Sequence, residues 1–262
     1  MKIKVLVDNN TYIDKYYYGE PALSFYIEES NKKILFDTGY SNVLLTNAKN
    51  MNIALEKLDY VVISHGHDDH TGGLKYLNEG YLNNAILLSH NKAFIKRKDH
   101  NIDIGCPISL DSLKIKKYID GTNGFSITDN LIFLGEIERK LDFEKNYVGY
   151  LDNGNKDPVI DDSALVFKNN DGIFIITGCS HSGICNIIEQ AKRITRKNKI
   201  NGIIGGFHLF KNDDRLTETI KYLKNNNIKN LYPCHCVSLD VKSELKKHFN
   251  VEEVAVSFEL DI

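Results

Sequence analysis

The stretch His65-Gly66-His67-Asp68-Asp69-His70 follows the apolar run 60–63, which is typical of a short buried strand. It holds the densest set of metal-binding side chains in the sequence, because neutral imidazole nitrogen and carboxylate oxygen are ligands of divalent metals. Alternate side chains of extended backbone point the same way, so His65 and His67 are expected on one side. The stretch therefore predicts a loop at a strand end that binds one or two metal ions.

The residues that follow support this interpretation. Asp69 and His70 are expected where the chain turns, because Thr71-Gly72-Gly73 loosens the backbone before a helical run that contains Leu74 and Leu77. A pattern of the form H-x-H-x-D-H arises by chance in roughly one chain in a thousand at this composition. A solvated polar loop is therefore the weaker interpretation.

Length and charge limit the function classes. The chain has 262 residues, enough for one large layered domain. Lys and Arg number 33 against 35 Asp and Glu, a formal net charge of -2, so nothing in the balance favours nucleic acid or an anionic membrane surface. We expect a small-molecule substrate.

Targeting signals and cysteines point to the cytoplasm. No stretch approaches the roughly 18 apolar residues needed to span a bilayer, and residues 1–7 alternate like a strand, unlike a signal peptide. The cysteines are too few and too unevenly spaced for a disulfide scaffold, so reduced thiols are expected. They are Cys106, Cys179, Cys185, Cys234 and Cys236.

The periodicity of apolar residues predicts a mixed α and β chain. Strands are predicted at 2–7, 24–27, 33–36, 60–64, 85–89, 131–134, 202–204, 230–232 and 254–258, with a hairpin formed by 164–167 and 173–176. Helices are predicted at 184–194, 216–223 and 243–249. We expect a single domain over 1–262, in which the weakly patterned range 97–156 is a possible cap or insertion.

Metal-type residues recur in loops that follow predicted strands. Sites in layered folds are built from such loops at one edge of a sheet, so these segments are expected to come together. The four loops are His65 to His70, Cys179-Ser180-His181-Ser182-Gly183, Gly205-Gly206-Phe207-His208-Leu209 and Cys234-His235-Cys236.

Two groups of motifs resemble a known family. The stretch 64–73, preceded by Leu35-Phe36-Asp37-Thr38-Gly39, resembles the metallo-β-lactamase superfamily of metal-dependent hydrolases. The stretches 177–183, 204–209 and 232–236 are similar to its 7,8-dihydropterin-6-methyl-4-(β-D-ribofuranosyl)aminobenzene-5'-phosphate synthase-like branch. The resemblance runs from about residue 35 to residue 236. It implies an α+β fold, the four-layer αββα sandwich of the metallo-β-lactamase type, with a metal centre at one edge.

The resemblance also implies ligand roles. Within the superfamily, the positions of His65 and His67 bind the first metal ion, and those of Asp69 and His70 bind the second. His235 corresponds to the late histidine that completes the second site. Two divalent ions are implied, with zinc expected and iron or manganese as alternatives.

Other positions match the family or depart from it. Asp37 matches a carboxylate that steadies the ligand loop, as ligating imidazoles commonly donate their other N–H to such a group. The family's third first-site histidine is absent before the hairpin, where Asp161-Asp162 stands, and Cys179 occupies the place of the usual bridging aspartate. Cys179 as a thiolate, His181 as a nitrogen ligand or Asp162 are the open replacements, of which His181 is favoured over Cys179.

His208 follows two glycines that allow close approach to a ligand, and we expect it to bind substrate or transfer a proton. Cys234 and Cys236 are expected to point away from His235 and to pack. Ordinary buried or surface roles are expected for His90, His100, His248, Cys106 and Cys185.

The chemistry implied is hydrolysis. Two adjacent ions lower the pKa of a shared water and present a metal-bound hydroxide to carbon or phosphorus, which Asp69 would orient. We expect a metal-dependent hydrolase of a phosphorylated or ester small molecule. The first alternative is the dihydropterin synthase, which forms a C–N bond with loss of diphosphate. The second is a non-catalytic metal-dependent ligand sensor or binding module.

Overall fold

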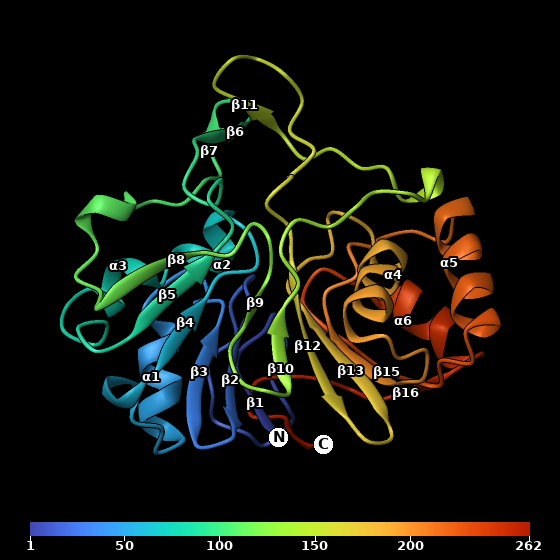
Figure 1. Ribbon diagram of the computed structural model, residues 1–262, viewed down its shortest axis with the longest axis horizontal. Coiled ribbons are helices and arrows are strands. Elements are labelled where there is room, and N and C mark those ends of the chain that lie inside the picture. The colour runs from blue at the N-terminus through green and yellow to red at the C-terminus, as the bar shows by residue number, and fades with distance from the viewer. The chain divides into compact units, whose positions relative to one another are not determined.

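The computed structural model describes residues 1–262, and the chain forms two compact units (Figure 1). The first unit contains Met1–Thr122, Val148–Asp157 and Ala255–Ile262, and the second contains Asn123–Tyr147 and Pro158–Val254. Each unit has its own seven-stranded sheet, its own helices and its own apolar core.

The sheet of the first unit has the order β17-β1-β2-β3-β4-β5-β8. β1, β2 and β3 pair antiparallel, whereas β3, β4, β5 and β8 run parallel, so the carboxyl ends of these four strands meet at one edge. The strands are β1 (Lys2–Val7), β2 (Ser24–Glu29), β3 (Lys32–Phe36), β4 (Tyr60–Val62), β5 (Ile86–Ser89), β8 (Lys117–Asp120) and β17 (Glu259–Asp261).

Short helices cover this sheet. They are α1 (Val43–Asn50), α2 (Asp68–Thr71) and α3 (Leu74–Leu77), with 3-10 turns at Leu55–Lys57 and Leu110–Ser112. Leu44 of α1 and Leu74 of α3 pack with Leu35 and Val61 of the strands, all fully buried. Burial of such a side chain contributes about 1.5–3 kcal/mol, so this core stabilises the edge from which the histidine loop emerges.

A small third sheet belongs to the same unit and projects beyond the ends of β4 and β5 (Figure 1). It consists of β6 (Arg97–Asp99), β7 (Ile102–Asp103) and β11 (Tyr150–Leu151), in the order β11-β6-β7. The backbone N–H of Asp68 donates to the carbonyl of Ile104 at 2.9 Å, and His67 forms an isolated bridge with Gly105. The small sheet is thus attached directly to the histidine loop.

A buried ion pair holds this small sheet. Arg97 Nε lies 2.6 Å from Asp157 Oδ2, and both side chains are at most 1% exposed. A buried ion pair adds little net stability, but loss of one partner leaves a charge in a medium that solvates it poorly.

We therefore expect Asp157→Ala to lower the free energy of unfolding by about 3–5 kcal/mol, measured by urea denaturation. The double variant Arg97→Met with Asp157→Leu should recover most of this loss, because no charge stays buried. Glu218→Ala, which removes an exposed partner of Lys221, should leave the unfolding midpoint nearly unchanged. An unaltered midpoint for Asp157→Ala would refute the role given to the pair.

The sheet of the second unit has the order β16-β15-β14-β13-β12-β10-β9. β9, β10, β12 and β13 pair antiparallel, and β13, β14, β15 and β16 run parallel, which again gathers carboxyl ends at one edge. The strands are β9 (Phe125–Ser126), β10 (Leu131–Phe133), β12 (Ala164–Asn169), β13 (Gly172–Thr177), β14 (Ile200–Gly205), β15 (Asn230–Pro233) and β16 (Asn250–Val251).

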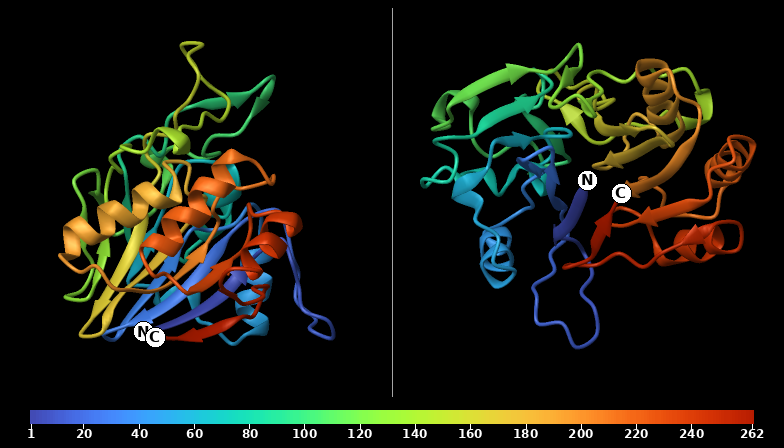
Figure 2. Two further views of the ribbon diagram at one scale, coloured as in Figure 1. Left: turned by 90° about the vertical axis from the view of Figure 1, so that its right-hand side faces the viewer. Right: turned by 60° about the horizontal axis from the view of Figure 1, so that its bottom comes forward.

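Three helices line one face of this sheet (Figures 1 and 2). They are α4 (Ile184–Thr195), α5 (Asp214–Asn225) and α6 (Leu239–Lys246), with a 3-10 turn at Asp142–Glu144. Side-chain caps start α5 and α6, where Asp213 accepts from the N–H of Leu216 at 3.1 Å and Ser238 accepts from that of Val241 at 3.2 Å. None of the helices of the protein is long and apolar enough to cross a bilayer.

Most predicted elements are present, with three corrections. The predicted strand at 254–258 is absent: Val256 makes only an isolated bridge with Thr11, and the strand lies at Glu259–Asp261. Ser257 has φ 75°, which breaks extended pairing there. α6 begins earlier than predicted because Ser238 caps it, and Asp69 and His70 lie in the short helix α2, where a turn was expected.

Candidate metal centre

In the first unit, parallel pairing brings two chemical segments to one sheet edge. Asp37 follows β3 directly, and the loop that starts at Ser64 follows the adjacent strand β4. Asp37 and Ser64 are both fully buried. The predicted loop at a strand end is therefore present, with the carboxylate of Asp37 beside it.

His65 and His67 converge as the alternating pattern predicted. His65 Nε2 lies 3.1 Å from His67 Nδ1. One ring nitrogen of each histidine and a carboxylate oxygen of Asp69 all lie within 4.8 Å of one another. Two nitrogens bound to one tetrahedral zinc ion at 2.0–2.1 Å would be about 3.3 Å apart. The observed separation fits a shared metal ion.

A hydrogen-bond relay defines the tautomer of His65. The backbone N–H of Ser64 donates to Asp37 Oδ1 at 2.7 Å, and its hydroxyl donates to Asp37 Oδ2 at 2.7 Å. Because the Ser64 hydroxyl has one proton, the 2.9 Å contact between its oxygen and His65 Nδ1 requires an N–H on Nδ1. Neutral His65 therefore presents the lone pair of Nε2, the nitrogen that faces His67.

The same carboxylate orients His70. His70 Nδ1 lies 2.7 Å from Asp37 Oδ2, and the Thr38 hydroxyl donates to the His70 carbonyl at 2.9 Å. An ionised carboxylate only accepts, so Nδ1 carries the proton and Nε2 keeps a lone pair. That Nε2 atom lies 3.6 Å from Asp69 Oδ2. One buried aspartate thus orients two histidines, His70 directly and His65 through Ser64, an arrangement that is usual around ligating imidazoles.

Close packing fixes the backbone between His65 and His67. A Cβ atom on Gly66 would clash with the carbonyl oxygen of Ala93 and with the Arg97 guanidinium. Only glycine permits this approach. The buried Arg97–Asp157 pair therefore supports the histidine loop as well as the small sheet.

Asp68 is the acidic residue of the loop that lies outside the ligand set. Burial, and to a smaller extent the neighbouring Asp69 carboxylate, raise the pKa of its carboxyl to about 6.

In the second unit, three potential ligands follow β13 and β15. The Cys179 sulfur lies within 4.8 Å of a ring nitrogen of His181 and within 4.8 Å of one of His235. β13 and β15 flank β14 in the parallel part of the sheet, so their carboxyl ends lie at the same edge. The structure thus brings together the predicted candidates of this unit.

Asp162, left open above as a ligand, makes hydrogen bonds to Ser182 through one of its two carboxylate oxygens. Its Oδ2 atom accepts hydrogen bonds from the backbone N–H of Ser182, at 2.9 Å, and from the Ser182 hydroxyl, at 2.5 Å. Burial raises the pKa of this carboxyl, and the Ser182 bonds oppose that rise. Asp162 therefore holds the loop next to His181 as Asp37 holds Ser64. The sequence offered only a pair of acidic residues before a strand as a signal.

Left-handed backbone recurs at the ends of these strands. Positive φ values occur at Asp37 (59°), Ser180 (60°), His208 (50°) and His235 (52°). Non-glycine residues adopt this region rarely, and such conformations gather at functional sites because the surrounding structure must maintain them.

His208 packs against His181. Their ring centroids are 4.5 Å apart, and Phe210 contacts His208 edge-on with a centroid distance of 4.8 Å. Asn146 Nδ2 lies 3.0 Å from His208 Nδ1, and Arg215 donates to the His208 carbonyl at 3.3 Å. The ring is therefore held in one orientation beside a candidate ligand.

The remaining histidines and cysteines have ordinary environments. Cys234 is buried, and Cys236 Sγ lies 3.6 Å from the Cys179 carbonyl oxygen. The two cysteines were expected on a strand, but β15 ends at Pro233, before both of them. His90 is buried and its Nδ1 accepts from the N–H of Lys92, His100 is exposed, and His248 pairs with Glu244.

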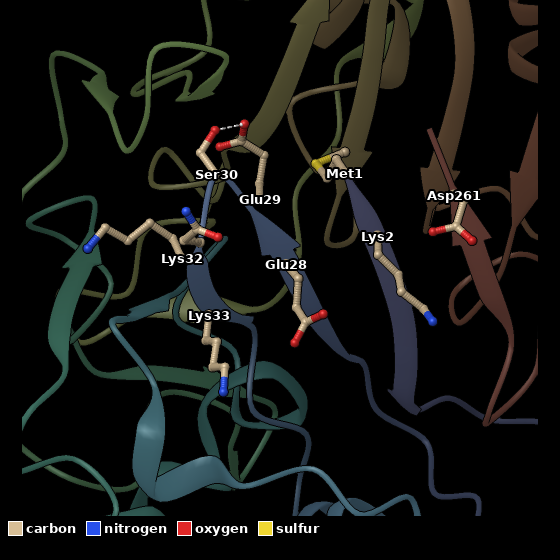
Figure 3. Close-up of a pocket in the computed structure, with 9 residues that line it drawn as sticks. Met1, Lys2, Glu28, Glu29, Ser30, Lys32, Lys33 and Asp261 are labelled. Atoms are coloured by element: carbon tan, nitrogen blue, oxygen red, sulfur yellow. Dashed lines mark hydrogen bonds between the residues drawn. The ribbon is translucent and has the colours of Figure 1, made fainter.

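A separate hollow of about 450 Å³ lies in the first unit between β1, the β2–β3 turn and β17 (Figure 3). Its rim carries Lys2, Glu28, Lys32, Lys33 and Asp261. β3 starts at this hollow and Asp37 follows its last residue, Phe36, so the hollow and Asp37 lie at opposite ends of that strand. It is no part of the candidate metal centre.

Mixed sheets flanked by helices, with histidine and aspartate clusters at strand ends, define an α+β protein with residues that could hold a metal ion. The sequence profile of the metallo-beta-lactamase superfamily matches residues 17–193. The chain therefore belongs to the metallo-β-lactamase superfamily, and the predicted family and fold class are confirmed.

Three relatives extend this result. Uncharacterized protein MJ0448 of Methanocaldococcus jannaschii is 34% identical, with 94% of each chain covered. The 7,8-dihydropterin-6-methyl-4-(beta-D-ribofuranosyl)-aminobenzene-5'-phosphate synthase of the same organism is 31% identical, covering 95% of this chain and 92% of its own. The crystal structure of Tm1679, described as a metal-dependent hydrolase of the beta-lactamase superfamily, is 26% identical, with a TM-score of 0.84 over 100% of this chain and 99% of its own.

Proposed function

We propose that the protein is a metal-dependent hydrolase that acts on a phosphorylated or ester small molecule. The observation that carries the proposal is the pair of ring nitrogens of His65 and His67, 3.1 Å apart, next to a buried aspartate that leaves His65 and His70 with Nε2 lone pairs. Histidines that only packed in a core would not require a buried carboxylate that fixes the tautomer of two rings. The name of Tm1679, a metal-dependent hydrolase, supports the same class.

The proposed ligands of the divalent ions are His65, His67, Asp69, His70, His181 and His235, with Cys179 as a further candidate. Imidazole with carboxylate suits zinc, and iron or manganese are alternatives. When bound, two such ions polarise the oxygen of the substrate and lower the pKa of water.

The chain's own residues supply the rest of the proposed mechanism. Asp37 keeps His70 in a fixed orientation by accepting a hydrogen bond from its Nδ1, and it orients His65 through the hydroxyl of Ser64. Asp69 orients the attacking water through its carboxylate, and His208 donates a proton or a hydrogen bond to an oxygen of the substrate.

The synthase is the second candidate, and the 31% identity to a relative with that name favours it. In that reaction the aminobenzene nitrogen forms a bond to the methyl carbon of the dihydropterin and displaces diphosphate from it. The charge that develops on the leaving diphosphate could be stabilised at the same ligand cluster. A fold alone does not define a substrate, so both reactions need to be assayed.

A direct assay separates these functions. The protein is incubated with bis-p-nitrophenyl phosphate, p-nitrophenyl phosphate and p-nitrophenyl acetate, and in parallel with a dihydropterin methyl diphosphate and a ribofuranosyl-aminobenzene phosphate. Release of nitrophenol that a chelator abolishes is the expected result. Diphosphate release only when both pterin and aminobenzene are present would replace the hydrolase by the synthase. Bound metal without turnover of any probe would favour a ligand sensor.

The proposed partner is a small molecule and the proposed compartment is the cytoplasm. The net charge of -2 offers no general attraction for nucleic acid. All five cysteines are free thiols, which supports a reducing compartment.

A further inference from the structure

His208 is held on several sides in the second unit. Its ring contacts that of His181 in a tilted arrangement, at an interplanar angle of 57°, and meets the ring of Phe210 edge-on at 80°. Its backbone has φ 50°, and its carbonyl accepts from Arg215 Nη1. A ring that cannot turn exposes its two nitrogens to different surroundings, so the partner of one nitrogen determines what the other offers.

The partner of Nδ1 is the side-chain amide nitrogen of Asn146, at 3.0 Å. An amide NH2 group donates hydrogen bonds and cannot accept them. His208 Nδ1 must therefore be the acceptor and carry no proton. In a neutral imidazole the proton then lies on Nε2.

Asn146 lies at the end of a segment that is anchored along its length. We call residues 139–147 the strap. Arg139 donates to the carbonyls of Pro158 and Val159 at 2.8 and 2.7 Å, and the backbone N–H groups of residues 140 and 141 donate to Asn186 Oδ1 at 3.0 and 3.1 Å. Glu144 Oε2 accepts from the N–H of Cys185 at 2.9 Å, at the start of α4. The strap is therefore fixed to α4, and Asn146 is presented to His208 by a rigid support.

We propose that Asn146 is a positioning residue that holds His208 in the tautomer protonated on Nε2, which makes His208 a hydrogen-bond donor toward the substrate. The use of this proton rests on the proposed hydrolase function, but the tautomer does not. The hydrogen-bond partner of Nδ1 differs between these histidines and determines which nitrogen carries the proton. His65 and His70 donate toward Ser64 and Asp37 and keep an Nε2 lone pair, whereas His208 accepts from Asn146 through Nδ1 and carries its proton on Nε2.

This assignment favours an oxyanion as the group that meets His208. A phosphoryl or carbonyl oxygen that gains negative charge accepts a hydrogen bond from a neutral imidazole N–H, and its attraction for the proton rises along the reaction. The substrate oxygen accepts a hydrogen bond from the Nε2–H of His208, while the lone pair on Nδ1 accepts from Asn146. Because its lone pair is occupied by Asn146, Nδ1 of His208 is not available to bind a metal ion.

The test is a long-range 1H–15N correlation of 15N-histidine-labelled protein, treated with chelator and then returned to zinc, at a mildly alkaline pH. The signals of His208 are assigned from their loss in His208→Gln. Wild-type protein should show a non-protonated Nδ1 and a protonated Nε2. Asn146→Asp should reverse the pattern, because a carboxylate only accepts and requires an N–H on Nδ1. Asn146→Ala should give a mixture of both tautomers.

Asn170→Asp, the same substitution at an exposed turn residue, is the matched control and should leave the His208 signals unchanged. A protonated Nδ1 in wild-type protein, or signals that Asn146→Asp does not move, would overturn the proposal. With a substrate in hand, Asn146→Asp should lower kcat by about 100-fold with little change in KM, the range expected for loss of a proton donor. If no substrate turns over, the proposed function fails while the spectra still decide the tautomer.

Discussion

Asp37→Asn should weaken divalent-metal binding about 10- to 100-fold, because it disturbs an outer partner of two metal-ligating histidines at once. Asp37 is fully buried and accepts from the N–H and hydroxyl of Ser64 and from Nδ1 of His70. An asparagine presents one oxygen and one NH2 group, so at least one of these donors faces another donor. The free energy of unfolding of the metal-free protein should fall by about 2–3 kcal/mol as a result.

Competition of each variant with a chromogenic chelator measures the affinity, and urea denaturation measures stability. Asp59→Asn is the matched control, because Asp59 accepts from Lys32 and Lys33 at the start of β3, at the far end of that strand from Asp37. It should bind metal as tightly as the wild type. Equal metal affinity in Asp37→Asn and the wild type would contradict the role of Asp37.

His67→Ala should remove at least half of the bound metal and lower turnover by more than about 100-fold, since outer partners alone contribute about 10- to 100-fold. His67 Nδ1 lies 3.1 Å from His65 Nε2, and the ring is only 5% exposed. Loss of one of two adjacent nitrogens leaves a first site without sufficient ligands. Metal content is measured by plasma mass spectrometry after dialysis.

The control for this variant is His100→Ala. His100 lies in an exposed turn, where its Nδ1 atom lies 3.0 Å from the exposed carboxylate of Asp99. It should retain the metal content and turnover of the wild type. The assignment of the histidine loop would be wrong if His67→Ala and His100→Ala held equal amounts of metal.

Local patterns predicted most of the fold because they depend on neighbours in sequence. Alternation and turn residues located the β12–β13 hairpin, and the buried face of α4 located that helix within one residue at its end. The prediction failed at 254–258, where apolar residues pack without strand pairing, since burial can be satisfied without a ladder. The prediction also missed the start of α6. The helix begins where Ser238 caps it, and the apolar periodicity does not mark that position.

The site was predictable where chemistry is concentrated in one loop and not where it depends on distant pairs. The alternation of His65 and His67 sufficed for their convergence. Asn146 and His208 are 62 positions apart, as Arg97 and Asp157 are 60 positions apart, and neither pair carries a local signature. Asp162 stays open as a ligand, and its two hydrogen bonds to Ser182, 20 positions away, likewise have no local signature in the sequence.

Titration of chelator-treated protein with zinc tests the central claim most directly. The turnover of p-nitrophenyl phosphate or bis-p-nitrophenyl phosphate is followed as metal is returned. The treated protein should show no turnover, and turnover should rise with added zinc and level off at about two equivalents, as expected for a two-metal hydrolase. Turnover that survives complete removal of metal, or a protein that takes up no zinc, would contradict it.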